Sequence, residues 1–200
     1  MIFKGTPRLK TDRLILRKIE PNDYKIAYEQ WCNNPEQVLY TVHGIHKSED
    51  VTKRVYDRWI EEYNDEKTMR WIIELKENSL PIGMIDINNT WSKYSSVEPG
   101  YIIARKYWGL GYATEATMRV MEYLFKECEL ETFYSEFMED NIGSGKVMKK
   151  CGMTQDGCLR NRCEDKNGKR QNLISMSITK DEYYKINKHM IDFKSIFFML

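Results

Sequence analysis

The stretch that most constrains this chain runs from Glu98 to Thr117 and reads as a short strand, a loop with two glycines and the start of a helix. Gly109 and Gly111 flank Leu110, so the backbone there can turn sharply and approach a ligand closely. Apolar residues then recur at helical spacing, and free N–H groups at such a helix start favour a phosphate or pyrophosphate. Two glycines before a helix also occur in ordinary tight turns. The local pattern therefore leaves two readings, an anion cradle and a plain turn.

Charge and composition exclude several classes of protein. The 31 basic and 30 acidic residues leave a net charge of +1, so nothing demands a nucleic-acid partner. No apolar run is long enough to span a membrane, and the N-terminus lacks the apolar core of a signal peptide, so a cytoplasmic protein with no membrane partner is expected. The five cysteines form no Cys-x-x-Cys pair and are odd in number, so neither a disulfide framework nor a metal site is expected.

The hydrophobic pattern predicts alternating strands and helices in one domain. With 200 residues the chain can build one substantial core. The predicted order is strand, helix, helix, three strands, helix, strand, helix and two strands. A polar loop is expected over 89–97, and a short last helix is expected to run from Asp181 to His189. Gly145 lies inside a predicted helix and is expected to loosen its first turn by about 1 kcal/mol relative to alanine.

Two motifs resemble signatures of a known family. Lys106-Tyr-Trp-Gly-Leu-Gly111 resembles the acetyl-CoA loop of the GNAT N-acetyltransferases, and its continuation looks most like the branch of ribosomal-protein N-terminal (Rim-type) acetyltransferases. Lys106 stands where the wider family has Arg or Gln. The segment that contains Asn141, Ser144 and Gly152 is similar to the second signature of the family. The resemblance covers roughly residues 9 to 184.

The resemblance implies an α/β (mixed α+β) fold, with one GNAT-like domain over 1–190. It implies a twisted mixed sheet of about six to seven strands, flanked by helices and splayed at the cofactor slot, where the strand at 100–104 leaves the strand at 132–138. The remaining segment, 191–200, is an apolar tail. Because this tail is apolar enough to pack on a partner subunit, a homodimer is one expectation.

The implied reaction is transfer of an acetyl group from acetyl-CoA to a primary amine by direct attack. The acceptor is either a protein N-terminus or a small-molecule amine. By resemblance, the cofactor-binding residues lie on the strand, the glycine loop and the second signature: Tyr101, Ile102, Ile103, Lys106, Trp108, Gly109, Leu110, Gly111, Tyr112, Ala113, Thr114, Asn141 and Ser144.

Two residues are candidates for the catalytic roles. Glu98 opens the cofactor strand, where family members often carry a carboxylate that acts as the base, and the alternative is a solvated carboxylate at a strand end. Ser144 matches the signature serine and would donate a hydrogen bond to the departing sulfur, while a helix-capping role is compatible with this. Met148 occupies the position of the tyrosine acid found in some relatives, which excludes that mechanism at this position.

The acceptor side is less well defined by the sequence. His43, His46 and Tyr134 are candidate substrate contacts, and the alternative for the two histidines is an ordinary polar loop. A non-catalytic acetyl-CoA-binding protein with the same fold is a competing hypothesis. A nucleotide-phosphate enzyme is disfavoured, because the loop lacks the ending of a P-loop and the third glycine of a dinucleotide fingerprint.

Overall fold

The computed structural model describes residues 1–41 and 44–197, with the side chains of 189–197 excepted. Its centre is an open sheet of eight strands in the order β1-β2-β3-β4-β5-β6-β8-β7. All neighbouring strands are antiparallel except β5 and β6, which are parallel. The strands are β1 (Leu9–Lys10), β2 (Leu14–Arg17), β3 (Arg70–Leu75), β4 (Pro81–Trp91), β5 (Ser96–Ile103), β6 (Thr132–Met138), β7 (Thr154–Glu164) and β8 (Arg170–Thr179).

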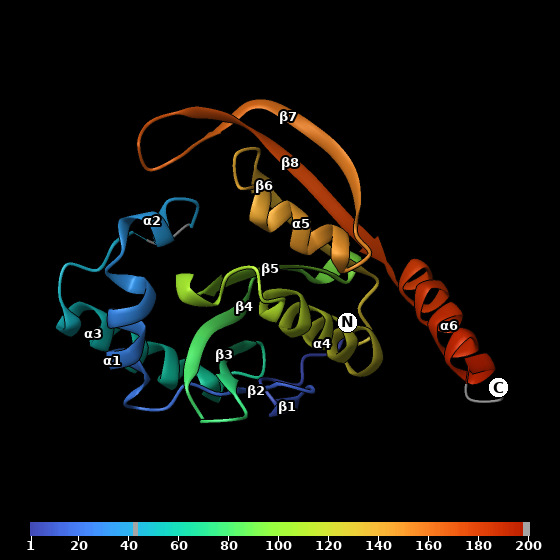
Figure 1. The fold of residues 1–200 in the computed structure, drawn as a ribbon, viewed down its shortest axis with the longest axis horizontal. Helices are drawn as coiled ribbons and strands as arrows, with labels where there is room; N and C mark the ends of the chain where they lie inside the picture. Colours follow the sequence, from blue (N-terminus) through green and yellow to red (C-terminus); the bar gives the residue numbers. More distant parts are fainter. Residues whose placement is uncertain (42–43, 198–200) are drawn as a thin grey trace.

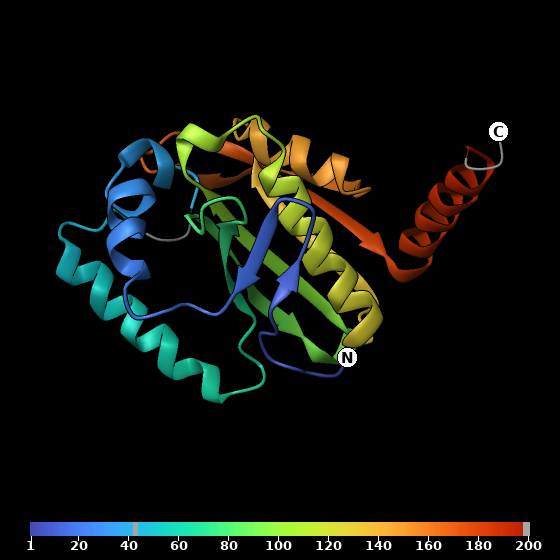
Figure 2. The same ribbon diagram turned by 60° about the horizontal axis from the view of Figure 1, so that its bottom comes forward.

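Helices cover both faces of this sheet (Figures 1 and 2). One face packs against α4 and α5 around a large apolar core, and the other packs against α1 and α3 around a smaller one. Ile72 and Ile73 on β3 belong to different cores, so this strand is buried on both faces. The α-helices are α1 (Asp23–Ala27), α2 (Pro35–Val38), α3 (Glu49–Glu61), α4 (Tyr112–Glu127), α5 (Ile142–Lys150) and α6 (Lys180–Phe197).

The C-terminal part extends away from this body. The long β7–β8 hairpin arches outward and α6 projects beyond the sheet (Figure 1). In the part of the chain that the structure describes, no helix combines the length and the apolar character needed to cross a membrane.

Local signals explain the ends of α5. The side chain of Asn141 accepts a hydrogen bond from the backbone of Ser144, as an N-cap residue does. At the other end Gly152 has φ +84°, its N–H donates to Lys149, and the N–H of Met153 donates to Met148. This pair of bonds is the Schellman motif that a glycine permits. The predicted start and end of this helix are therefore confirmed.

The predicted fold class is confirmed, and three boundaries differ from the prediction. A tight turn at Thr11, whose hydroxyl accepts from the N–H of Leu14, divides the first strand into β1 and β2, so the sheet has eight strands. The predicted loop at 89–97 is wrong, since β4 and β5 continue through it around a short 3-10 turn at Ser92–Tyr94. The last helix continues past His189 to Phe197.

Candidate active site

The strands β5 and β6 separate soon after they meet. Their ladder consists of Ser96 paired with Thr132 and Val97 paired with Phe133, and it does not continue beyond. Pro99 stands two residues after the last pair and has no N–H with which to continue it. The predicted splay is therefore present, and a proline within β5 helps to produce it.

Backbone groups of β5 face the gap that this separation leaves. The N–H of Ala104 donates to Ile82 on β4, and alternate residues of an antiparallel strand bond to the same neighbour. The peptide groups of Tyr101 and Ile103 therefore point to the side away from β4. Consistent with this, the carbonyl of Pro99 accepts a hydrogen bond from Ser135 on β6 (3.4 Å) and that of Ile103 accepts one from the indole of Trp108 (2.6 Å).

The loop before α4, with Gly109 and Gly111, has a run of N–H groups without hydrogen-bond partners in the described chain, next to this gap. We call it the glycine loop. Gly109 and Gly111 have φ of +76° and +86°, a region that other residues rarely adopt, and Gly111 is the N-cap of α4. From Gly109 to Thr114 no backbone N–H donates to another described residue, and the first helical bond runs from Glu115 to Gly111. These N–H groups and the positive end of the α4 dipole form an anion cradle.

A hydroxyl pair lies on the α4 and α5 side of the gap. Tyr101 donates to Oγ of Ser144 at the start of α5, with 3.1 Å between the two oxygens. Burial raises the pKa of Tyr101 to about 12, so its hydroxyl remains protonated at neutral pH. Because Ser144 accepts from Tyr101, its own hydrogen is directed elsewhere and is available to a further acceptor.

Gly145, next to Ser144, lies where α5 comes close to the ring of Phe137 on β6. A Cβ at this position would lie 2.6 Å from Cζ of Phe137 on β6. The glycine therefore allows α5 to approach β6, and the expected weakening of the helix accompanies a packing requirement that its sequence does not show.

Polar and aromatic side chains lie together on the face of the sheet that packs against α1 and α3, opposite to the face that carries α4 and α5. The side chains of Val97, Tyr101 and Ile103 pack in the α4 core and that of Ile102 packs toward the α1 and α3 core, so Glu98 faces the latter side. Asn89 on β4 donates to Oε2 of Glu98 at 2.8 Å.

Two residues of β6 join Glu98 on this face. Tyr134 donates a short hydrogen bond to Glu136, two residues further along the strand, and its ring lies edge-on to that of Trp91, with 5.9 Å between the centres. Burial and the bond to Glu136 raise the pKa of Tyr134 to about 12, and the charges of Glu136 and Glu98 contribute. We call Glu98, Tyr134, Glu136 and Trp91 the acceptor-face cluster.

The remaining predicted residues lie in different places. The imidazole of His46 shares a hydrogen bond with the hydroxyl of Thr52 on α3, at 2.9 Å, and its backbone N–H donates to the backbone carbonyl of Cys32. His43 lies outside the described residues. Lys106 is exposed in a 3-10 turn, and its ammonium lies 4.9 Å from the centre of the Tyr107 ring.

Sequence reasoning missed Glu136 and Trp91. The alternation of Tyr134 and Glu136 along one strand was a usable signal, since residues two apart share a face. Trp91 gave no such signal, because its segment was expected to be a loop.

Comparisons with known proteins agree with this geometry. Residues 13–154 match the acetyltransferase (GNAT) domain family. The chain is 28% identical to the uncharacterized N-acetyltransferase YoaA of Bacillus subtilis (strain 168), over 77% of this chain and 86% of that protein. It is 25% identical to the putative ribosomal N-acetyltransferase YdaF of the same strain, over 86% and 94%.

Solved structures share the fold. The spermidine N-acetyltransferase from Vibrio cholerae, solved in complex with CoA and spermine, superposes with a TM-score of 0.74 at 23% identity. The superposition covers 87% of this chain and 99% of that one.

Proposed function

This chain belongs to the GNAT acetyltransferase family, and on that premise we propose that it acetylates a cationic primary amine that enters from the acceptor-face cluster. The family match shows that the protein is an enzyme that transfers an acetyl group from acetyl-CoA to an amine. The observation that carries the finer proposal is the position of Glu98 and Glu136 on one sheet face, on the two strands that separate.

The residues that would hold acetyl-CoA are those with unsatisfied backbone groups. The N–H groups from Gly109 to Thr114 suit the pyrophosphate. The N–H groups of Tyr101 and Ile103 and the carbonyl of Tyr101 suit the amides of the pantetheine arm, as an added strand would, while the carbonyl of Ile103 already accepts from Trp108. Acetyl-CoA supplies the acetyl group and a thiol leaving group. We assign cofactor contacts on this basis to the glycine loop, to β5 and to the start of α5.

Glu98 would take the proton of the attacking amine. A peptide α-amine, with a reference pKa near 8, costs about 1 kcal/mol to deprotonate at pH 7, whereas a lysine amine costs about 4–5 kcal/mol. The bond from Asn89 to Oε2 of Glu98 orients the carboxylate. Glu136, fixed by Tyr134, adds a second negative charge that favours a cationic acceptor near the rings of Tyr134 and Trp91.

Ser144 would stabilise the departing sulfur. Its hydroxyl accepts from Tyr101 and so has its own hydrogen free to donate. Since the pKa of Tyr101 is raised by burial, Tyr101 keeps its proton and holds Ser144 in this orientation. A tyrosine hydroxyl thus reaches the leaving-group side from β5 even though Met148 occupies the family position on α5.

Two acceptor classes fit the cluster, and relatives of each kind are known. One relative is named a putative ribosomal N-acetyltransferase, and one structural neighbour is named a spermidine N-acetyltransferase. A protein N-terminus and a small polyamine both carry a cationic primary amine. The positive charge of either amine would pair with the carboxylates of Glu98 and Glu136.

The finer features of organisation are also proposals. We place the domain at 1–190, because β7 and β8 continue the sheet beyond the family match and α6 follows β8 directly. Packing of the apolar tail 191–200 on a second copy would make a homodimer, which light scattering of the full chain would detect. The free state of all five cysteines fits a cytoplasmic location.

The test is release of free CoA from acetyl-CoA with three acceptors: spermidine, a peptide with a free α-amine, and an N-acetylated peptide that contains lysine. We expect turnover with at least one of them.

Glu98→Gln should alter the pH–rate profile, and an unchanged profile would refute its role as the base. Glu136→Gln should raise KM for the acceptor and leave KM for acetyl-CoA unchanged, with Glu139→Gln, at the exposed position just after β6, as the control. Binding of acetyl-CoA without turnover on any acceptor would favour the non-catalytic alternative.

A further inference from the structure

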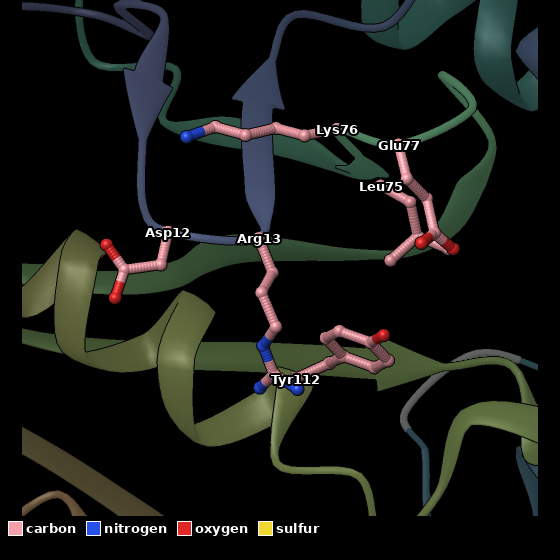
Figure 3. Close-up of a pocket in the computed structure, with 6 residues that line it drawn as sticks. All are labelled: Asp12, Arg13, Leu75, Lys76, Glu77 and Tyr112. Atoms are coloured by element: carbon pink, nitrogen blue, oxygen red, sulfur yellow. The ribbon is translucent and has the colours of Figure 1, made fainter.

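The turn between β1 and β2 reaches the glycine loop through the side chain of Arg13 (Figure 3). Nη1 of Arg13 donates to the carbonyl of Leu110, the residue between the two loop glycines, at 3.1 Å. Its Nε and Nη2 each lie 2.7 Å from Oε2 of Glu115, in the first turn of α4. Its guanidinium carbon lies 4.3 Å from the centre of the Tyr112 ring. One side chain therefore contacts the loop and the first turn of the helix together.

Glu115 is held from two other directions. Its Oε1 accepts from the hydroxyl of Thr11 at 2.5 Å and from the backbone N–H of Arg13 at 2.9 Å. Burial would raise the pKa of Glu115, but these bonds and those from the guanidinium outweigh it and leave the pKa lowered. Glu115 is therefore ionised at neutral pH and neutralises much of the charge of Arg13.

The two loop glycines themselves have open surroundings on the side where a side chain would lie. Around the position of a Cβ on Gly109 there is no atom within 4 Å, and for Gly111 the single neighbour is Nη2 of Arg13 at 3.4 Å. Glycine residues lose more backbone entropy on ordering than any other residue. A loop that must present its N–H groups to an anion therefore gains from a contact that fixes it beforehand.

We propose that Arg13 is a positioning residue for acetyl-CoA, which acts by holding the carbonyl of Leu110 and the first turn of α4 so that the loop N–H groups face the pyrophosphate. The inference rests on the phosphate-binding role given to this loop in the proposed function. Arg13 is half exposed, and the carboxylate of Glu115 largely satisfies its charge. The bond to Leu110 distinguishes it from an ordinary surface ion pair, because that bond ends on the loop itself.

The experiment compares two acetyl donors, acetyl-CoA and S-acetylpantetheine, which lacks the pyrophosphate. Arg13→Met should raise KM for acetyl-CoA about tenfold, which corresponds to about 1.4 kcal/mol of binding free energy. The same variant should leave kcat and KM with S-acetylpantetheine near wild-type values, which also shows that it is folded. Arg119→Met is the matched control. Like Arg13, Arg119 bonds one backbone carbonyl and one carboxylate on α4, but its carbonyl is that of Lys10 on β1 and not one of the loop. It should leave both KM values unchanged.

A second variant separates positioning from direct attraction of phosphate. Glu115→Gln removes a negative charge near the loop and also weakens the hold on Arg13. If Arg13 positions the loop, this variant raises KM for acetyl-CoA. If Arg13 attracts the phosphates directly, the freed guanidinium lowers KM, and that result would overturn the proposal.

The remaining outcomes separate this proposal from the proposed function. If wild-type enzyme uses both donors with the same KM, the phosphate-binding role of the loop is wrong. If wild type distinguishes the donors but Arg13→Met keeps the wild-type KM for acetyl-CoA, only the role of Arg13 is wrong. An equal loss with both donors would mean that Arg13 merely stabilises the fold, and this too would overturn the proposal.

Discussion

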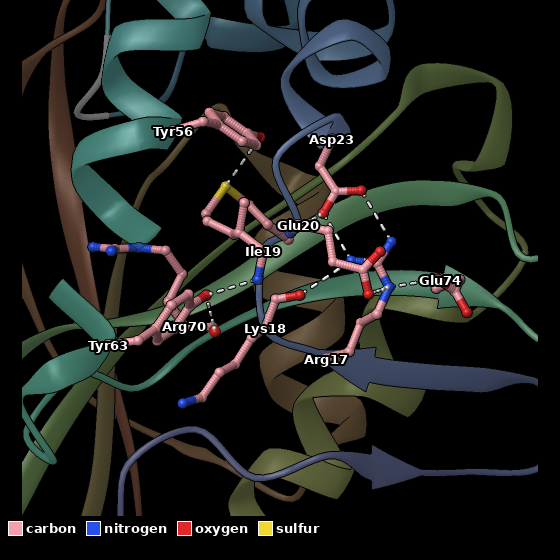
Figure 4. A network of polar contacts seen from close by, with 10 residues as sticks. Arg17, Lys18, Ile19, Glu20, Asp23, Tyr56, Tyr63, Arg70 and Glu74 are labelled. Atoms are coloured by element: carbon pink, nitrogen blue, oxygen red, sulfur yellow. Dashed lines mark hydrogen bonds and ion pairs between the residues drawn. The ribbon is translucent and has the colours of Figure 1, made fainter. Parts of the chain in front are cut away.

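Replacing Arg17 by methionine tests how α1 is attached to the sheet, on the face that carries the acceptor-face cluster (Figure 4). Arg17 on β2 lies 2.5 Å from Glu74 on β3, and two of its nitrogens lie 2.7 and 2.9 Å from Asp23 at the start of α1. The side chains of all three residues are at most 8% exposed. Burial alone would lower the pKa of Arg17, but the hydrogen bonds and charges of Asp23 and Glu74 raise it, so the guanidinium remains charged.

Among the described residues, loss of this cation leaves two buried carboxylates without a cationic partner, and Asp23 keeps only the backbone N–H of Glu20. Removing one member of a buried ion pair typically costs about 3–5 kcal/mol. For a chain of this size, a loss of about 4 kcal/mol corresponds to a fall in Tm of about 8–16 °C. Arg17→Met should therefore show a much lower urea midpoint, measured by tryptophan fluorescence and by far-UV circular dichroism.

Two further variants make the Arg17 prediction specific. Lys18→Met, at the adjacent exposed position, should change stability by less than about 0.5 kcal/mol. Adding Asp23→Asn and Glu74→Gln to Arg17→Met removes the stranded charges and should recover much of the loss. If Arg17→Met alone stays within about 1 kcal/mol of wild type, the reasoning about buried charge is refuted.

Three further predictions concern packing, pH and the leaving group. Gly145→Ala should destabilise the fold by about 1–2 kcal/mol in urea unfolding, because the 2.6 Å approach to the ring of Phe137 outweighs the gain in helix propensity, and a stabilised variant would contradict this. Burial raises the pKa of Asp86 from 3.8 to about 6, so the neutral carboxyl stabilises the fold below pH 4 and that contribution is lost as the pH rises through about 6. In urea midpoints measured from pH 4 to 7.5, Asp86→Asn should gain on wild type by up to about 3 kcal/mol as the pH rises, and the opposite trend would show that the ion pair of Asp86 dominates. Ser144→Ala should lower kcat about tenfold or more in the assay of CoA release, and Tyr101→Phe should lower it less, since Tyr101 acts through Ser144; equal rates for wild type and Ser144→Ala would remove the serine from the mechanism.

Local chemistry explains which parts of the site were predictable. Gly109 and Gly111 are readable because a sharp turn before a helix requires backbone angles that favour glycine. Asn141 and Gly152 are readable for the same kind of reason, as cap residues of one helix. The cofactor half of the site consists mainly of such local features.

The acceptor half depends on pairing between distant strands. Glu98 and Glu136 share one face of the sheet beside Tyr134 only because β5 and β6 are parallel neighbours, and no local pattern records that pairing. The region around Trp91 reads as a polar loop because its strand residues are exposed, so its apolar alternation is absent. Arg13 reaches the glycine loop across 97 positions of sequence, which spacing alone does not reveal.

The central claim is that acetyl-CoA binds along the free edge of β5, in the gap that opens after Val97 and Phe133. Amide hydrogen exchange with and without acetyl-CoA measures this directly. The account predicts that exchange slows at the N–H groups of Tyr101 and Ile103 and from Gly109 to Thr114, since these groups lack partners in the free protein. Protection that leaves β5 and the glycine loop unchanged while acetyl-CoA is bound would contradict it.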